Sequence, residues 1–155
     1  MTLTIGDPAP DFDLAADGGG RVSLADFKGR KLVLYFYPKD DTPGCTNEAK
    51  AFSEAADEFA AAGAALLGVS KDSIKAHDRF KAKYELRIPL GSDPEAATIA
   101  SYDSWVEKSL YGRNYMGIDR STFLIDSEGR VRKIWRKVKV PGHAAAVLAA
   151  VQELG

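Results

Sequence analysis

The chain has 155 residues, enough for one ordinary domain with a sizeable core, and its 45% hydrophobic and 28% charged residues are typical of a globular protein. Its 21 basic residues nearly balance its 22 acidic ones, so the net charge of -1 gives no electrostatic basis for binding nucleic acid or an anionic membrane. The longest apolar run, residues 32–37, is too short to span a bilayer, and the opening segment lacks the basic and apolar regions of a signal peptide. We therefore expect a soluble cytoplasmic protein with a single domain at residues 1–155.

The first thirty residues are expected to form an N-terminal β-hairpin. Apolar residues alternate with polar ones on either side of a glycine-rich turn at residues 17–20. The alternating residues are Phe12, Leu14, Val22 and Leu24.

The only cysteine follows a strand that is expected to be buried on both faces. Residues 31–37 form a continuous apolar, β-favouring run. A helix should begin soon afterwards, because Thr42 is a candidate N-cap and Pro43 suits the first helical position. Cys45 then lies in the first turn of that helix. Its apolar face is marked by Ala49, Phe52, Ala56 and Phe59.

This placement favours a reactive cysteine. The thiolate is the nucleophilic form, and the unpaired amides and positive dipole end of a helix N-terminus favour it. The alternative is a small buried hydrophobe without chemistry. Cys45 is flanked by Gly44, Thr46, Asn47 and Glu48, so burial among apolar side chains is not expected. One cysteine and two widely spaced histidines do not make a structural zinc site.

The next segment completes a βαβ unit. Residues 64–70 read as a second buried strand, and a helix between two buried strands requires a parallel crossover. The start of that helix then lies at the carboxyl edge of the first strand. Cys45 is therefore expected at the edge of the sheet where α/β active sites gather.

The remaining segments predict a thioredoxin-like α/β fold, with a mixed central sheet and helices on both faces. They are a helix from Asp72 or Ser73 to about Leu86, a strand at 88–90, a helix capped by Ser92 or Asp93 with Pro94 in first position, a long loop at 103–118, a strand, turn and strand at 120–135, and a helix at 142–154.

The spacing of Pro38, Thr42 and Cys45 matches the P-x-x-x-T-x-x-C signature of the peroxiredoxins. The chain resembles the peroxiredoxin Q group, also called the bacterioferritin comigratory protein family, over nearly its whole length. The matching blocks are GDPAPDFDL, YFYPKDDTPGCTNEA, LGVSKDS, LGSDPE and YGRNYMGIDRSTFLIDSEG.

The resemblance implies a thiol peroxidase of antioxidant defence that uses no metal and no organic cofactor. Cys45 would be the peroxidatic nucleophile, which attacks hydrogen peroxide or an organic hydroperoxide and becomes a sulfenic acid. Thr42 would place its hydroxyl near the sulfur, and Pro38 would shape and dry the pocket. Arg120 would stabilise the thiolate and bind the peroxide oxygens, and Glu48 would orient Arg120.

The sequence departs from the family pattern at Lys50. Many members carry a second, resolving cysteine at this position, and this chain has no other cysteine. The resemblance then implies a one-cysteine variant whose sulfenic acid is reduced by thioredoxin, glutaredoxin or glutathione from outside. The family also implies a monomer.

Two other classes remain open from the residues alone. One is a thioredoxin-fold binding module in which Cys45 senses redox state without turnover. The other is a cysteine hydrolase that pairs Cys45 with His77 or His143, although no further helper motif supports it. A C-x-x-C pair is absent, which disfavours thiol-disulfide oxidoreductase activity.

Overall fold

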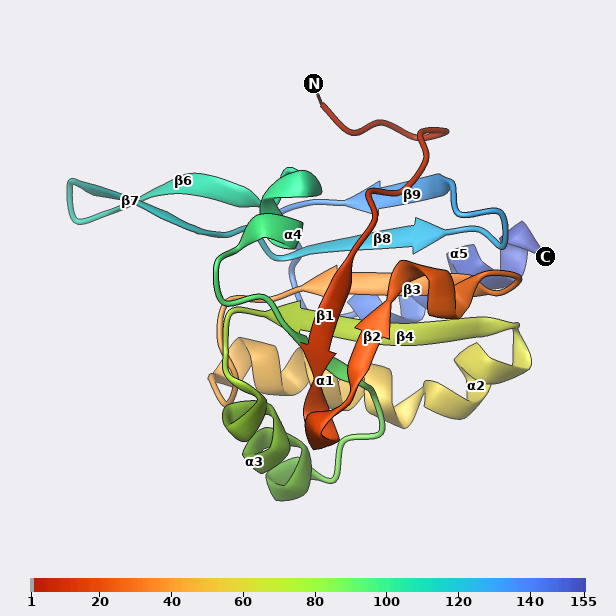
Figure 1. Ribbon diagram of the computed structural model, residues 1–155, viewed down its shortest axis with the longest axis horizontal. Coiled ribbons are helices and arrows are strands. Elements are labelled where there is room, and N and C mark those ends of the chain that lie inside the picture. The colour runs from red at the N-terminus through yellow and green to blue at the C-terminus, as the bar shows by residue number, and fades with distance from the viewer. Residues whose placement is uncertain (1) are drawn as a thin grey trace.

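The computed structural model describes residues 2–155, which form a seven-stranded mixed sheet and a separate two-stranded hairpin (Figure 1). The order in the large sheet is β2-β1-β5-β4-β3-β8-β9. The strands are β1 (Asp13–Ala16), β2 (Arg21–Ser23), β3 (Lys31–Phe36), β4 (Ala64–Ser70), β5 (Leu90–Ser92), β6 (Trp105–Leu110), β7 (Arg113–Ile118), β8 (Ser121–Ile125) and β9 (Val131–Trp135). The helices are α1 (Pro43–Glu54), α2 (Ala56–Ala61), α3 (Ile74–Tyr84), α4 (Ala97–Ser101) and α5 (His143–Leu154), with short 3-10 turns η1 (Asp17–Gly19) and η2 (Leu24–Phe27).

The strand β3 is the centre of the molecule. It pairs in parallel with β4 on one side and antiparallel with β8 on the other. Its side chains alternate between two hydrophobic cores, so both of its faces are buried. This explains its continuous apolar run and confirms the predicted parallel crossover.

Helices cover both faces of the sheet, as predicted. One core contains Ile99 from α4 together with Phe12 from the segment before β1. The other core contains Phe52 from α1, Phe80 from α3 and Val147 from α5. The predicted N-terminal hairpin is also confirmed, because β1 and β2 pair antiparallel across η1. No helix within residues 2–155 has the length and apolar character needed to cross a membrane.

The helix that carries the cysteine begins where the sequence predicted. Pro43 is the first residue of α1. The helical segment is interrupted at Ala55, whose φ of -92° and ψ of 5° separate α1 from α2. Phe59 of α2 is still fully buried, so the apolar face continues across the break. Gly63, at a φ of 79°, then ends the helical segment before β4.

The long loop predicted for residues 103–118 is wrong, because this segment is the β6–β7 hairpin, which projects from the body of the protein (Figure 1). Its two-residue turn, Tyr111 and Gly112, has positive φ values of 51° and 78°, as a type I′ turn requires. Most side chains of both strands are exposed or half-buried. Because neither face is buried along the hairpin, no alternating apolar pattern marks it in the sequence.

The strand expected at residues 88–90 lies further along the chain, at Leu90–Ser92. Ser92 pairs with Ser70 of β4 and with Ala15 of β1. These partners come from distant parts of the chain and decide which residues join the sheet. Local apolar pattern alone could not fix this register.

The next helix also begins later than expected. Pro94 was predicted to be its first residue, but α4 begins at Ala97. Asp93 nevertheless helps to cap it, since its Oδ2 accepts a hydrogen bond of 2.8 Å from the backbone N–H of Ile99. The N-cap position is held by Ala96, so the predicted capping position and helix start are both wrong, although Asp93 still binds a free N–H of the first turn.

Candidate active site

Cys45 lies in the first turn of α1, which follows the carboxyl end of β3, as predicted (Figure 1). Its side chain is only 1% exposed and belongs to the core cluster that includes Tyr35 and Phe52. The expectation that Cys45 avoids apolar surroundings is therefore wrong. Its polar neighbour Asn47 is exposed on the outer side of the helix, while Cys45 faces the sheet.

Arg120 reaches Cys45 from the residue before β8. Ser121 pairs with Phe36 at the end of β3, and this register brings Arg120 to the start of α1. Its Nη2 donates a hydrogen bond to Cys45 Sγ at 3.4 Å, and its Nη1 donates to Glu48 Oε1 at 2.7 Å. The Arg120 guanidinium therefore contacts both Cys45 and Glu48, the two side chains on which the family resemblance implies that it acts.

Glu48 is a buried carboxyl group with one unused oxygen. Its side chain is 1% exposed, and among the described residues Oε2 has no hydrogen-bond partner. Burial raises the pKa of Glu48 to about 7, and the charge and hydrogen bond of Arg120 offset only part of that rise. Glu48 can therefore exchange a proton near neutral pH.

Thr42 occupies the N-cap position with an extended backbone, as predicted. Its side chain makes no capping bond to α1 in the described chain, because its hydroxyl donates to the carbonyl of Lys39 at 2.8 Å. That donation leaves the hydroxyl oxygen as an acceptor. Pro38 is exposed in the same loop, which joins β3 to α1.

Gly44 has a role in the geometry that sequence reasoning did not identify. A Cβ at this position would lie 3.1 Å from Arg120 Nη2, closer than an ordinary van der Waals contact. The absence of a side chain therefore lets the guanidinium lie against the first turn of α1, beside Cys45.

A buried hydrogen-bond network anchors the loop between β3 and α1, and sequence reasoning missed it too. Asp40 Oδ1 accepts from the Tyr37 hydroxyl at 2.5 Å, and Asp40 Oδ2 lies 2.7 Å from His77 Nδ1. The other ring nitrogen, Nε2, lies 2.9 Å from the carbonyl oxygen of Gly91. The Asp40 amide donates to Asp72 Oδ2 at 2.8 Å. The loop is therefore anchored both to α3, through His77, and to the segment after β4, through Asp72.

The partners of His77 indicate that its ring is charged. A carbonyl oxygen can only accept, and an ionised carboxylate can only accept, so both ring nitrogens must donate. Burial by itself lowers the pKa of His77, but the hydrogen bond and charge of Asp40, together with the Gly91 carbonyl, raise it above 6.5. His77 and Asp40 thus form a buried ion pair.

We expect His77→Gln to lower the free energy of unfolding by about 1–3 kcal/mol near pH 6, because it removes a buried donor to Asp40. Since the pKa of His77 is higher in the folded than in the unfolded chain, its contribution is fully present below pH 6.5 and is lost as the pH rises through the folded value. The difference between wild type and variant should therefore shrink as the pH rises above 6.5 through the raised pKa of His77 in the folded chain. Urea unfolding followed by circular dichroism at each pH measures it.

His143 provides the control of opposite sign. Its Nε2 lies 2.8 Å from Thr122 Oγ1, and burial, with the charge of Arg120, lowers its pKa to about 4. Stability linked to His143 therefore falls as the pH drops from 6.5 through about 4, and His143→Gln should change the pH dependence of stability only in that acid range. A difference that grew with pH in His77→Gln would mean that the folded state holds His77 neutral.

Three of the four ring nitrogens of the two histidines are hydrogen-bonded to groups other than the Cys45 sulfur. Those of His77 face Asp40 and Gly91, and Nε2 of His143 faces Thr122. The hydrolase alternative needs one of these nitrogens as the base for Cys45, and the geometry gives that alternative no support.

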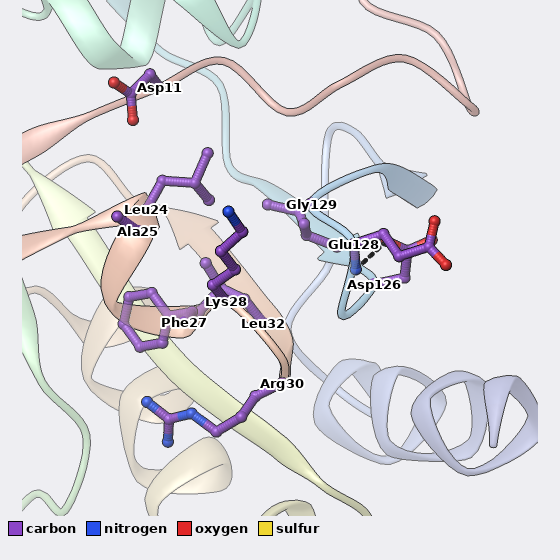
Figure 2. Close-up of a pocket in the computed structure, with 11 residues that line it drawn as sticks. Asp11, Leu24, Ala25, Phe27, Lys28, Arg30, Leu32, Asp126, Glu128 and Gly129 are labelled. Atoms are coloured by element: carbon purple, nitrogen blue, oxygen red, sulfur yellow. Dashed lines mark hydrogen bonds between the residues drawn. The ribbon is translucent and has the colours of Figure 1, made fainter.

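A cavity of about 260 Å³ lies away from Cys45, between η2 and the loop that follows β8 (Figure 2). It adjoins Leu32 near the start of β3, whereas Cys45 follows the end of that strand. The lining residues are Asp11, Leu24, Ala25, Phe27, Lys28, Arg30, Leu32, Ile125, Asp126, Glu128 and Gly129. The cavity therefore takes no part in the chemistry of the cysteine.

The fold and the position of Cys45 define a class of protein, the α/β proteins that carry a cysteine at a helix N-terminus. Comparison with known proteins identifies the family within that class. The model of the AhpC/TSA family matches residues 5–134. Peroxiredoxin Bcp of Bacillus subtilis is 49% identical over 154 residues, covering 99% of this chain and 98% of the relative. Peroxiredoxin Bcp of Xanthomonas campestris is 51% identical over 147 residues, covering 94% and 92%. A solved structure of the Xanthomonas campestris bacterioferritin comigratory protein has a TM-score of 0.91 at 47% identity and covers 98% of this chain and 97% of that one.

The chain belongs to the AhpC/TSA family. The predicted membership of the peroxiredoxin Q group and the predicted thioredoxin-like fold are confirmed. It is therefore an enzyme, a thiol-dependent peroxidase whose reaction takes a peroxide and a thiol or thioredoxin-type reductant.

Proposed function

We propose that Cys45 is the peroxidatic nucleophile and that the enzyme reduces hydrogen peroxide and organic hydroperoxides. The observation that carries this assignment is the 3.4 Å hydrogen bond from Arg120 to Cys45 Sγ in the first turn of α1. A fixed cation and a helix N-terminus both favour the thiolate. The Xanthomonas campestris relative is described for alkyl peroxide reduction, which supports organic hydroperoxides as substrates.

Residues around Cys45 can assist each step of the reaction. The thiolate attacks one peroxide oxygen, an S–O bond forms as the O–O bond breaks, and water or an alcohol leaves. Arg120 stabilises the charge that develops on the oxygens. Thr42 accepts a hydrogen bond from the peroxide, and Pro38 fixes the entry of the loop without offering a backbone donor.

The reductant must come from outside the chain, because an intramolecular disulfide needs a second cysteine and the chain has one. Lys50, at the position where the family resemblance implies a resolving cysteine, is exposed, and its Nζ lies 6.0 Å from the centre of the Tyr84 ring. We propose thioredoxin, glutaredoxin or glutathione as the direct reductant. We also propose a monomeric, single-domain protein of the cytoplasm, a reducing compartment that suits a lone thiol.

The test is peroxide consumption by the purified protein, first with thioredoxin and its reductase, then with glutathione and glutaredoxin. Mass spectrometry follows the oxidation state of Cys45 throughout, and Cys45→Ser serves as the inactive control. Sustained turnover in either system is the expected result and identifies the reductant.

Other outcomes would oppose the proposal. A single sulfenic acid on Cys45 followed by no turnover in both systems would favour a redox sensor. Acylation of Cys45 by an ester substrate, with no reaction toward peroxide, would favour the hydrolase.

A further inference from the structure

Within residues 2–155, one cation, the Arg120 guanidinium, contacts both acidic groups of the active site, Cys45 and Glu48. Arg120 Nη2 donates to Cys45 Sγ at 3.4 Å, and Nη1 donates to Glu48 Oε1 at 2.7 Å. Both acidic side chains are 1% exposed. A thiolate and a carboxylate buried side by side repel each other, and one guanidinium balances only one negative charge. The pair is therefore expected to share one proton in the reduced enzyme.

The surroundings of Glu48 favour its neutral form whenever Cys45 is a thiolate. Oε2 is buried and has no hydrogen-bond partner among residues 2–155. Burying an ionised oxygen there costs more free energy than burying a neutral one. The Tyr35 hydroxyl of β3 is also buried nearby and has no hydrogen-bond partner in the described part of the chain. The other titratable groups near the pair are Asp40 of the loop, already hydrogen-bonded to Tyr37 and His77, and His143 of α5, whose pKa near 4 keeps it neutral.

We propose that Glu48 is a catalytic acid, which takes the proton of the Cys45 thiol and passes it to the oxygen that leaves from the peroxide. Cys45 and Glu48 are three residues apart on α1 and therefore lie on one face of the helix, toward Arg120. This role rests on the proposed peroxidase function and adds to it a proton donor that the reaction needs.

The step balances in atoms and charge. The thiol gives its proton to the Glu48 carboxylate, and the resulting thiolate attacks the terminal peroxide oxygen. The electron pair of the O–O bond moves to the second oxygen, which takes the proton from Glu48 and leaves as water or alcohol. Cys45 is then a neutral sulfenic acid, and Glu48 is again a carboxylate. Arg120 faces one negative charge at each stage, so no uncompensated charge is buried at any point.

The position of the pKa of Glu48, about 7, agrees with this role. A general acid works best when its pKa lies near the working pH, because the proton is then both present and transferable. A carboxyl at the ordinary value of 4.5 would hold almost no proton at neutral pH.

The test uses Glu48→Gln, which keeps an oxygen acceptor for Arg120 but cannot carry the proton. Rate constants for Cys45 oxidation are measured by stopped-flow tryptophan fluorescence with tert-butyl hydroperoxide and with peracetic acid. The first peroxide releases a strongly basic alkoxide that needs a proton, and the second releases acetate, which does not. In this variant Arg120 faces no carboxylate and balances the Cys45 thiolate alone, so the thiolate still forms, with its proton released to solvent. We expect the variant to lose about a hundredfold in rate with tert-butyl hydroperoxide and to keep the wild-type rate with peracetic acid.

The matched control is Glu54→Gln, which removes an exposed carboxylate from the same helix and should leave both rates unchanged. Equal losses of Glu48→Gln with both peroxides would overturn the proposal, since they would mean that Glu48 only positions Arg120. A wild-type enzyme that reacts with neither peroxide would instead contradict the proposed function.

A second measurement does not depend on the folding of the variant. Infrared difference spectra of the wild type, reduced minus oxidised to the sulfenic acid, should contain the C=O stretch of a buried protonated carboxyl in the reduced state. Glu54→Gln should keep this band. Its absence from the wild type near pH 6 would overturn the proposal.

Discussion

Arg120→Met should slow the oxidation of Cys45 by hydrogen peroxide about 100- to 1,000-fold, which is the usual cost of removing a donor that stabilises developing oxygen charge. The variant loses the group that lies 3.4 Å from the sulfur, so both the thiolate and the attacked peroxide lose their fixed cation. Stopped-flow tryptophan fluorescence measures the rate constant. Arg21→Met is the matched control, because the Arg21 side chain is 64% exposed on β2 and forms its ion pair with the exposed side chain of Asp13.

Arg120→Lys separates charge from geometry. A lysine supplies one cation but cannot place two rigid donors on Cys45 and Glu48 together. We therefore expect Arg120→Lys to recover only part of the lost rate. Recovery of the full wild-type rate would show that charge alone suffices and that the two-armed contact of Arg120 is unimportant. A normal rate in Arg120→Met would contradict the site assignment itself.

The local part of the active site could be predicted from the sequence because its signals are adjacent in the chain. The apolar run of β3, the turn residues and the Thr42-Pro43 pair fix where α1 starts, and Cys45 follows two residues later. What local signals could not give is the direction of the Cys45 side chain. The polar flanks suggested exposure, but helix periodicity sends Cys45 to the sheet and Asn47 to solvent.

Contacts between distant residues depended on more than local pattern. Arg120 and Glu48 are 72 residues apart, and the resemblance to the family named both, whereas unaided reading would treat Arg120 as a surface residue. Asp40 and His77 are 37 residues apart, and although Asp40 lies within a quoted block, His77 lies in none, so their ion pair was missed. A histidine on an otherwise apolar helix face was the one available signal, and it did not indicate its partner.

The two-stranded β6–β7 hairpin escaped prediction for a different reason. Strand signals in a sequence come from burying one face, and this hairpin has little buried surface along most of its length. Its tip residue Tyr111 is 95% exposed. Backbone pairing and a tight turn hold this hairpin together, so its sequence carries little hydrophobic pattern from which strands could be predicted.

Phe52→Ala should lower the free energy of unfolding by about 3–5 kcal/mol, a large share of the stability of a typical domain. Phe52 is fully buried on α1, stacks on Tyr35 of β3 at 4.8 Å between ring centres, and contacts Phe59 of α2 and His143 of α5 at 5.9 Å each. Its loss removes contacts with three elements and leaves a cavity beneath the helix that carries Cys45. Urea unfolding measures the change.

Phe52→Ala also tests whether the accessibility of Cys45 depends on the stability of the fold. Cys45 is 1% exposed, so a bulky maleimide reaches it only when α1 opens away from the sheet. Because Phe52 holds α1 against β3, Phe52→Ala should speed maleimide labelling of Cys45 in native buffer by the factor that its loss of stability predicts. Tyr111→Ala, at the exposed hairpin tip, should change neither stability nor labelling. Labelling that stayed at the wild-type rate despite lower stability would mean that Cys45 is reached by a local motion at the N-terminus of α1, independent of its anchor.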